Sequence, residues 1–299
     1  MENFLLGTSG YDYPEWRGVF YPADLKRKDF LIFYSTVFNA LELNFSFYGM
    51  PTAQRIFSFY ERSEGRLSFS IKANRSLTHE VSRSWKNDAK EFKQAVFPVY
   101  EKDALCALLF QFPETFTYTK ENRLYLAELL KEFDGLPCVV EFRCRNWLQE
   151  RVLAGLEERN ASLVFCDMPM QHLAQTSIIS KYANGAERCM PRHPLVNADC
   201  TVGKTAYIRL HGRNENAWYA KASVQNPSDK NGSGRYRYNY SDEELIEFVP
   251  IIRSGVDSGK RTMVFFNNHP DGSGAQNARR LGEMMGLCVK PEESSLIKV

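Results

Sequence analysis

Short apolar runs recur along the chain, and segments with helical periodicity separate most of them. The apolar runs predict buried strands. They cover residues 4–11, 41–47, 67–74, 105–112, 139–143, 163–167, 206–211 and 263–266. Helices are predicted at about 29–39, after Thr52, at 88–102, 122–133 and 147–159, from Ser241 and from about Gln276. Strands that alternate with helices in this way form a parallel sheet.

Eight such units in 299 residues indicate one architecture. They predict an α/β fold, a TIM-like (β/α)8 barrel with eight parallel strands. No GxGxxG pattern follows the first strand, which weakens the alternative of a doubly wound dinucleotide-binding sheet. Because the composition changes abruptly nowhere, we expect a single domain over 1–299. It would carry an irregular insertion at about 170–204 and a lid-like loop at about 212–240.

Local signals mark the ends of several helices. Thr52 is placed as an N-cap, and Ser241 with Glu244 forms a capping-box pattern. Pro98 falls inside the helix at 88–102, where it predicts a kink or a break.

Alternation along each strand indicates which side chains point into the barrel. The outward face packs on helices and must be apolar, so outward Leu41 and Leu43 place Glu42 and Asn44 inward. The same parity directs these polar side chains inward: Lys72, Asn74, Gln111, Glu141, Arg143, Tyr207, Arg209 and His211. Asp167 and Asn267 lie at the ends of strands whose parity the pattern does not decide.

TIM barrels carry their active sites at the C-terminal ends of the strands. We therefore expect Glu42, Lys72 and Glu141 to be catalytic, because carboxylates in different environments can divide acid and base roles. The expected substrate-binding residues are Asn44, Asn74, Gln111, Arg143, Asp167, Arg209, His211, Asn267, Gly272 and Gly274. The alternative is a self-neutralising network, such as Glu42–Lys72 and Glu141–Arg209, that only fills the barrel.

Two finer alternatives concern the chemistry. Lys72 could act as a Schiff-base nucleophile, although nothing in the adjoining sequence marks it. A divalent ion (Mg, Mn or Zn) could be held by some of Glu42, Glu141, Asp167, His211 and His269. Because no HxxxH or HxH spacing occurs, we predict no metal ligands and no resident cofactor, with a divalent metal left open.

An anion site is predicted at the turn after the eighth strand. Gly272 and Gly274 stand before the last helix, where barrels commonly bind phosphate on backbone N–H groups. Six cations belong to the same rim: Lys72, Arg75, Arg143, Arg145, Arg209 and Arg213. A simple flexible connection is the alternative for the glycines.

Aromatic residues gather in two of the loops at this end. Tyr11, Tyr13 and Trp16 follow the first strand, and Trp218 precedes an Arg–Tyr alternation at 235–240. Such residues either stack on a ligand's rings or pack as a lid.

The composition restricts the setting. The formal net charge is +2, and the seven cysteines form no CxxC pair, which favours a reducing compartment. The first residues do not resemble a signal peptide, and no apolar stretch reaches membrane-spanning length. We expect a soluble cytoplasmic protein with no membrane partner.

Several motifs together resemble one known family. They are GTSGY at 7–11 with Trp16, ELN at 42–44 with Phe47 and Tyr48, FSIK at 69–72, QFP at 111–113, VEFR at 140–143 with Trp147, and RLHGR at 209–213. DEEL at 242–245 and FNNH at 266–269 continue the match. The chain thus resembles the domain of unknown function 72 (YecE-like) family. The resemblance implies a TIM-like barrel and assigns no activity.

From the residues we expect an enzyme that acts on a small anionic substrate, phosphorylated or carboxylated, by acid/base chemistry at the C-terminal mouth. Hydrolase and lyase are both open, and the sequence does not indicate an oligomeric state. The alternatives are a barrel that binds or processes nucleic acid, which is the less favoured partner, and a non-catalytic binder of an anionic ligand. A nucleic-acid binder needs a basic track beyond the pocket.

Overall fold

The computed structural model describes residues 3–169, 203–218 and 233–287. Eight parallel strands pair in chain order, and β8 pairs with β1 to close the cylinder. The strands are β1 (Phe4–Ser9), β2 (Ala40–Leu43), β3 (Ser68–Lys72), β4 (Leu105–Phe112), β5 (Cys138–Phe142), β6 (Ser162–Asp167), β7 (Thr205–Leu210) and β8 (Arg261–Phe266). The predicted (β/α)8 barrel is therefore confirmed.

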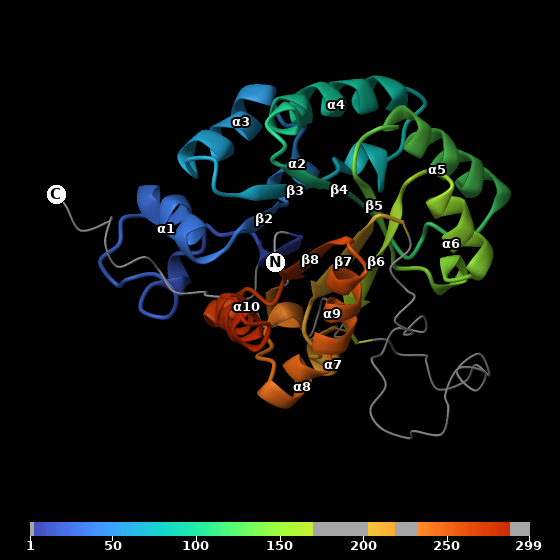
Figure 1. Ribbon diagram of the computed structural model, residues 1–299. Helices are drawn as coiled ribbons and strands as arrows, with labels where there is room; N and C mark the ends of the chain where they lie inside the picture. The colour runs from blue at the N-terminus through green and yellow to red at the C-terminus, as the bar shows by residue number, and fades with distance from the viewer. Residues whose placement is uncertain (1–2, 170–202, 219–232, 288–299) are drawn as a thin grey trace, which may run out of the picture.

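Helices lie around the outside of the strands (Figure 1). They are α1 (Phe30–Val37), α2 (Phe45–Tyr48), α3 (Ala53–Arg62), α4 (Trp85–Glu101), α5 (Lys120–Glu132), α6 (Glu150–Glu157), α7 (Glu215–Trp218), α8 (Asp242–Ile246), α9 (Val249–Asp257) and α10 (Ser273–Met284). The short 3₁₀ helices η1 (Pro14–Trp16), η3 (Arg75–Leu77), η4 (Arg145–Trp147), η8 (Ser233–Tyr236) and η9 (Pro270–Gly272) lie in loops. None of the described helices is both long and apolar enough to cross a lipid bilayer.

Two apolar layers follow from the alternation of side chains. Val140 and Phe142 join the large cluster between strands and helices, whereas Val139 belongs to a smaller cluster inside the barrel. The inner cluster also contains Cys166 and Phe265, which settles the parity of β6 and β8. Cys166 points inward, so Asp167 after it belongs to the outer face.

The structure corrects the second strand. It ends at Leu43, and the residues from Phe45 form α2 instead of extending the strand. Ser46 Oγ donates to the backbone oxygen of Lys72 at 2.6 Å, and Asn74 Nδ2 donates to the backbone oxygen of Ser46 at 2.8 Å. These bonds hold α2 against the end of β3, which is why the chain turns there.

Helix ends are predicted with mixed success. The Thr52 cap and the Ser241–Glu244 capping box are confirmed. The helix that starts at Ser241 stops at Ile246, and α9 begins with Pro250 in its first turn, where a missing N–H costs nothing.

Other element boundaries differ from the prediction. Helix α4 continues through Pro98 without a break, because its apolar stripe stays buried on both sides of the proline. The predicted helix at 147–159 divides into η4 and α6, and α10 begins three residues before Gln276. Of the expected insertion and lid-like loop, residues 170–202 and 219–232 lie outside the described residues.

Candidate functional site

Arg209 lies at the centre of the barrel's polar interior. Its side chain is 3% exposed, and it contacts carboxylates from two other strands. Nε and Nη2 donate to the two oxygens of Glu42 at 2.9 and 2.7 Å, a bidentate pair. Nη1 donates to Glu141 Oε2 at 2.6 Å. One guanidinium therefore links β2, β5 and β7 across the cylinder.

Glu42 is completely buried and fully hydrogen-bonded. Besides Arg209, it accepts from Ser9 Oγ at 2.6 Å, from Tyr207 Oη at 2.8 Å and from Asn44 Nδ2 at 3.1 Å. Burial alone would raise the pKa of Glu42, but the charge of Arg209 and the hydrogen bonds from Arg209, Ser9 and Tyr207 lower it. The carboxylate is held ionised.

Glu141 is buried in the same way and has two cationic partners. Arg143 Nη2 lies 2.5 Å from Oε1, while Arg209 contacts Oε2. Burial raises the pKa of Glu141, yet the charges of Arg143 and Arg209 hold it far below the ordinary value. The two glutamates and two arginines balance in charge, and we call Glu42, Glu141, Arg143 and Arg209 the central network.

Lys72 adds a fifth charge at the end of β3. Nζ donates to Gln111 Oε1 at 2.9 Å and lies 4.2 Å from the centroid of the Phe47 ring. In the described part of the chain, no ion pair within 4.0 Å involves Lys72. Burial, and then the charge of Arg209, lowers the pKa of Lys72 to about 8.

His211 follows β7 and faces both guanidiniums. Nε2 lies 3.3 Å from Arg143 Nη2 and 3.5 Å from Arg209 Nη1. Burial and these charges lower the pKa of His211 well below its ordinary value, so the ring is neutral. A guanidinium can only donate, so Nε2 accepts and the ring proton belongs on Nδ1. Nδ1 lies 2.9 Å from Nδ2 of Asn267, whose amide can present its oxygen to that proton by a half turn.

A group that could hold a metal ion lies beside the central network. The ligand atoms of Glu141, Cys166 and His211, all buried, lie within 4.8 Å of one another. However, both Glu141 oxygens already face guanidiniums, and His211 Nε2 does so too. Burial raises the pKa of Cys166 well above its ordinary value, which favours the thiol over the metal-binding thiolate. A cation here would have to displace Arg143 and Arg209.

Not every residue expected at the site joins this group. Asp167 instead accepts from Arg213 Nε at 2.9 Å and from Tyr240 Oη at 2.7 Å. Asn74 caps η3 and holds α2. Their substrate-binding roles, like that of Asn44 beside Glu42, stay predictions.

The turn at which we expect phosphate to bind is packed against the loop after β1 of the same chain. Gly272 adopts a φ of +76°, and a Cβ there would meet Val19 at 2.7 Å. Gly274 packs on the backbone of Asn268. Nearby, Trp16 Nε1 donates to the backbone oxygen of His269 at 2.8 Å. Anion binding by the two glycines therefore stays a prediction, on a turn covered by the loop after β1.

Aromatic side chains surround the mouth. Trp218 and Tyr236 each lie 6.0 Å from the His211 ring, and they pack edge to face at 5.7 Å. Arg143 lies 5.9 Å from the Trp218 ring. Tyr13 stacks on His269 at 4.7 Å. Two loops distant in sequence thus contribute rings to one rim.

Some participants were not expected from the sequence. Ser9 was missed because both faces of β1 are apolar, and Cys166 because β6 gives no parity signal. Tyr207 was placed inward but not at the site. Its single proton goes to Glu42, so Ser70 Oγ, 2.7 Å away, donates to the Tyr207 oxygen.

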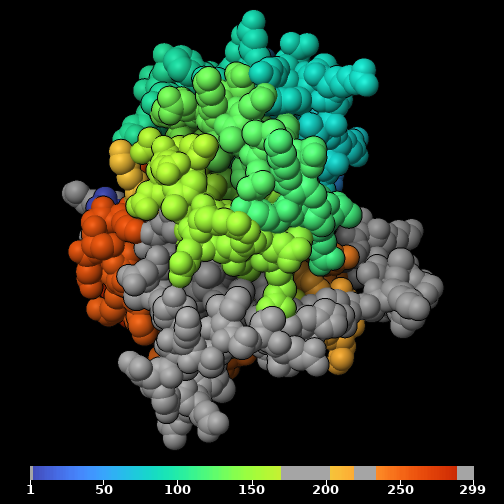
Figure 2. Space-filling model, turned by 90° about the vertical axis from the view of Figure 1, so that its right-hand side faces the viewer, coloured from blue at the N-terminus to red at the C-terminus, as the bar shows by residue number. Residues whose placement is uncertain are grey.

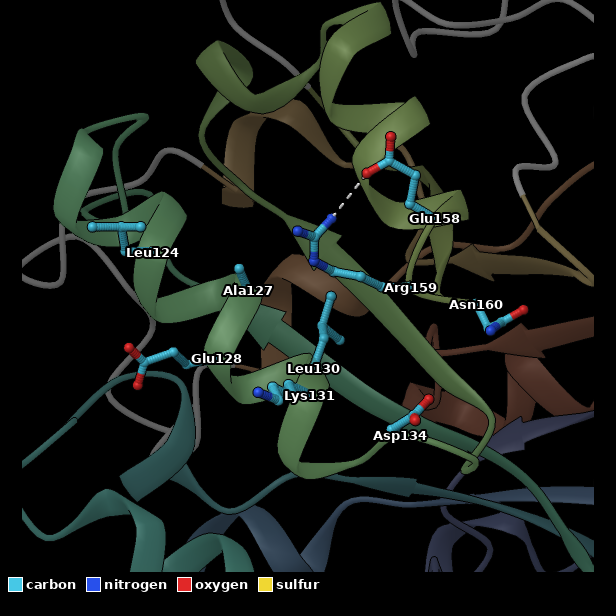
Figure 3. Close-up of a pocket in the computed structure, with 9 residues that line it drawn as sticks. All are labelled: Leu124, Ala127, Glu128, Leu130, Lys131, Asp134, Glu158, Arg159 and Asn160. Atoms are coloured by element: carbon cyan, nitrogen blue, oxygen red, sulfur yellow. Dashed lines mark ion pairs between the residues drawn. The ribbon is translucent and has the colours of Figure 1, made fainter.

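A separate groove lies on the outside of the barrel. It has a volume of about 450 Å³ and lies between α5 and the end of α6, on the face shown in Figure 2. Figure 3 shows its lining, which includes Leu124, Leu130 and Arg159. It shares no lining residue with the central network, so the chemistry described here does not involve it.

Comparisons with known proteins agree on one family. The family "Protein of unknown function DUF72" matches residues 5–295. The UPF0759 protein YunF of Bacillus subtilis is 26% identical over 276 residues, which is 89% of this chain and 90% of that protein.

Solved structures of the same family are similar too. A DUF72 family protein from Thermotoga maritima is 30% identical with a TM-score of 0.73, covering 95% of this chain and 99% of its own. One from Enterococcus faecalis, 22% identical with a TM-score of 0.73, covers 98% of this chain and 100% of its own, and it supports the fold alone.

Proposed function

Since the chain belongs to the DUF72 family of proteins of unknown function, we propose a function from its site: an enzyme that binds a small anionic substrate in front of Lys72 and Arg143. Lys72 would carry the acid/base chemistry. The carboxylates of the central network would hold the cations in place.

The observation that carries this proposal is a surplus of positive charge. Glu42 and Glu141 offset Arg209 and Arg143, which leaves Lys72 as the third cation against two carboxylates. A buried or half-buried charge without a partner is costly, and an incoming anion would offset it. Arg143, whose side chain is 14% exposed, would be the second contact.

The pKa values support the division of roles. Glu42 accepts hydrogen bonds on both oxygens, Glu141 lies between two guanidiniums, and both are held ionised, so they are poor proton donors near neutrality. Lys72, with a pKa of about 8, exchanges its proton readily in that range. We assign no metal in this proposal, because guanidiniums lie against Glu141 and His211.

A thermal-shift screen tests the proposal. The whole chain is heated at pH 7 with phosphate and with panels of phosphorylated and carboxylated metabolites. We expect one class to raise the Tm, and Lys72→Met to weaken its binding by at least about tenfold, because a hydrogen bond to a charged group is lost. Lys90→Met, which removes an exposed lysine of α4, serves as the matched control.

Four outcomes would contradict the proposal or a part of it. The proposal would be overturned if no small anion raised the Tm, or if the Lys72→Met and Lys90→Met variants bound the anion equally well. Binding confined to polynucleotides with steep salt dependence would favour the nucleic-acid alternative instead. A stabilising ligand that is recovered unchanged after long incubation would support anion binding and contradict the proposed enzymatic activity.

A further inference from the structure

We propose that Lys72 is a covalent nucleophile, and that the substrate is a small anionic aldehyde or ketone, such as a 2-oxo acid, whose carbonyl carbon forms an imine with Nζ. This inference rests on the anion site of the proposed function and deepens it by naming the substrate class, with Lys72 as nucleophile in place of its acid/base role. Arg143 would hold the carboxylate or phosphate while Lys72 attacks the carbonyl.

The surroundings of Nζ suit a neutral amine. Its hydrogen-bond partner is the oxygen of an amide, which stabilises an ammonium less than a carboxylate would. Gln111 is itself fixed, because its Nε2 donates to the backbone oxygen of Phe112 at 3.0 Å. Oε1 therefore stays directed at Lys72 and orients one N–H, which leaves the lone pair of the neutral amine free for attack.

The apolar wall beside the amine is fixed by the same strand end. Phe47 belongs to α2, and Ser46 of that helix donates to the backbone oxygen of Lys72 at 2.6 Å. The bond from Asn74 to the backbone oxygen of Ser46 is a second link between the helix and the end of β3. The ring thus stays 4.2 Å from Nζ, where it limits the hydration of the amine and its face attracts the ammonium form.

Nearby positive charge disfavours protonation further. Burial and the charges of Arg209 and Arg143 outweigh Glu141 and Glu42 in lowering the pKa of Lys72. At pH 7 about 10% of Lys72 would be neutral, compared with less than about 0.1% of an exposed lysine. Lysine amines are activated as nucleophiles by an apolar pocket or by adjacent cations, and Lys72 has both.

The reaction balances without an oxidant or a reductant. The lone pair of neutral Nζ forms a bond to the carbonyl carbon, and the C=O π pair moves to oxygen. A proton passes from nitrogen to that oxygen, which gives a carbinolamine. Loss of the oxygen as water, with the second proton from nitrogen, leaves the C=N bond. Protonation of the imine makes it an electron sink for bond cleavage at the neighbouring carbon.

Borohydride trapping tests the inference. The full chain is incubated at pH 7 with glyoxylate or pyruvate, reduced with borohydride and mapped by peptide mass spectrometry. We expect the reduced adduct on Lys72 at least about tenfold above any other lysine. It should be absent in Lys72→Arg, which keeps a charge but forms no imine, and retained in Lys90→Arg.

Gln111→Glu adds a second readout, the pH profile of trapping, which would not change if Lys72 were only structural. A carboxylate near Nζ favours the ammonium, so trapping at pH 7 should slow by about tenfold and its pH profile should shift upward. The wild-type profile should rise around pH 8. Labelling spread over exposed lysines, or a profile that Gln111→Glu does not shift, would overturn the inference.

A control ligand separates the two proposals. Oxamate has the shape and charge of pyruvate but carries an amide carbonyl that does not form an imine. A Tm increase with oxamate without an adduct from pyruvate or glyoxylate would overturn the covalent step and leave the anion site. Neither effect with any anion would overturn both.

Discussion

Two clusters among the described residues of this barrel hold a largely buried arginine among carboxylates, and they differ in charge balance. In the central network, Arg209 lies between Glu42 and Glu141. In the second cluster, the Arg213 side chain, 11% exposed, contacts Asp167, Glu244 and Glu247. We call these four residues the Arg213 cluster.

The Arg213 cluster is built as a structural link. It has three carboxylates for one guanidinium and joins the end of β6 to α8. Tyr240 Oη donates to Asp167 and accepts from the backbone N–H of Gly212 at 2.8 Å, which ties down the start of the loop after β7.

The central network carries the opposite surplus. With Lys72 it has three cations for two carboxylates, and the extra cation donates to a neutral amide, lies over a ring and forms no ion pair within 4.0 Å among the described residues. Buried charge alone therefore does not distinguish the two clusters. The informative feature is a charged group that its own cluster leaves without a counter-ion.

The largest expected effect is on the free energy of unfolding, when the arginine at the centre of each cluster, Arg209 or Arg213, is replaced. Arg209→Met leaves two fully buried carboxylates without their shared partner and should lower the free energy of unfolding by about 3–5 kcal/mol. Arg213→Met should cost at least about 1 kcal/mol less, because Glu244 and Glu247 are partly exposed and can rehydrate. Urea unfolding of both variants measures the difference. A larger loss for Arg213→Met would reverse the ranking of the two clusters.

An intermediate effect, of opposite sign, is expected at Lys72. Lys72→Met should raise the free energy of unfolding by about 2 kcal/mol at pH 7, because it removes a cation that folding leaves without a counter-ion. The folded-state pKa of Lys72 lies below the unfolded value, so the wild type gains stability as the pH rises from about 8 towards 10.5. The advantage of the variant should therefore be full below pH 8 and shrink above it. A difference independent of pH would show that packing, not charge, causes it.

The smallest effect sharpens the comparison from the other cluster. Tyr240→Phe removes the hydroxyl between Asp167 and Gly212 and should cost about 1–2 kcal/mol in thermal or urea unfolding. It should leave anion binding at Lys72 unchanged, because the Arg213 cluster shares no side chain with the central network. Loss of binding in this variant at full folding would connect the two clusters functionally.

Much of the fold was predictable from local pattern. Short apolar runs along the chain predicted eight buried strands. Because Val140 and Phe142 face outward, the alternation placed Glu141 inside the barrel. The cap at Thr52 and the capping box at Ser241 were readable because both are made within one turn of chain. Boundaries failed where contacts from other segments decide them, as at α2, where Asn74 holds the backbone of Ser46.

The sequence by itself determined which face of β2, β3, β4, β5 and β7 is polar, because that property has a period of two residues along the chain. Only the tertiary structure decided which charges pair. Arg209 and Glu42 are 167 residues apart, and their contact depends on the width and closure of the barrel. No local pattern encodes which side chains meet once the cylinder closes. In the closed barrel Arg209 pairs with both glutamates, Asp167 pairs with Arg213, and Lys72 lies beside an amide.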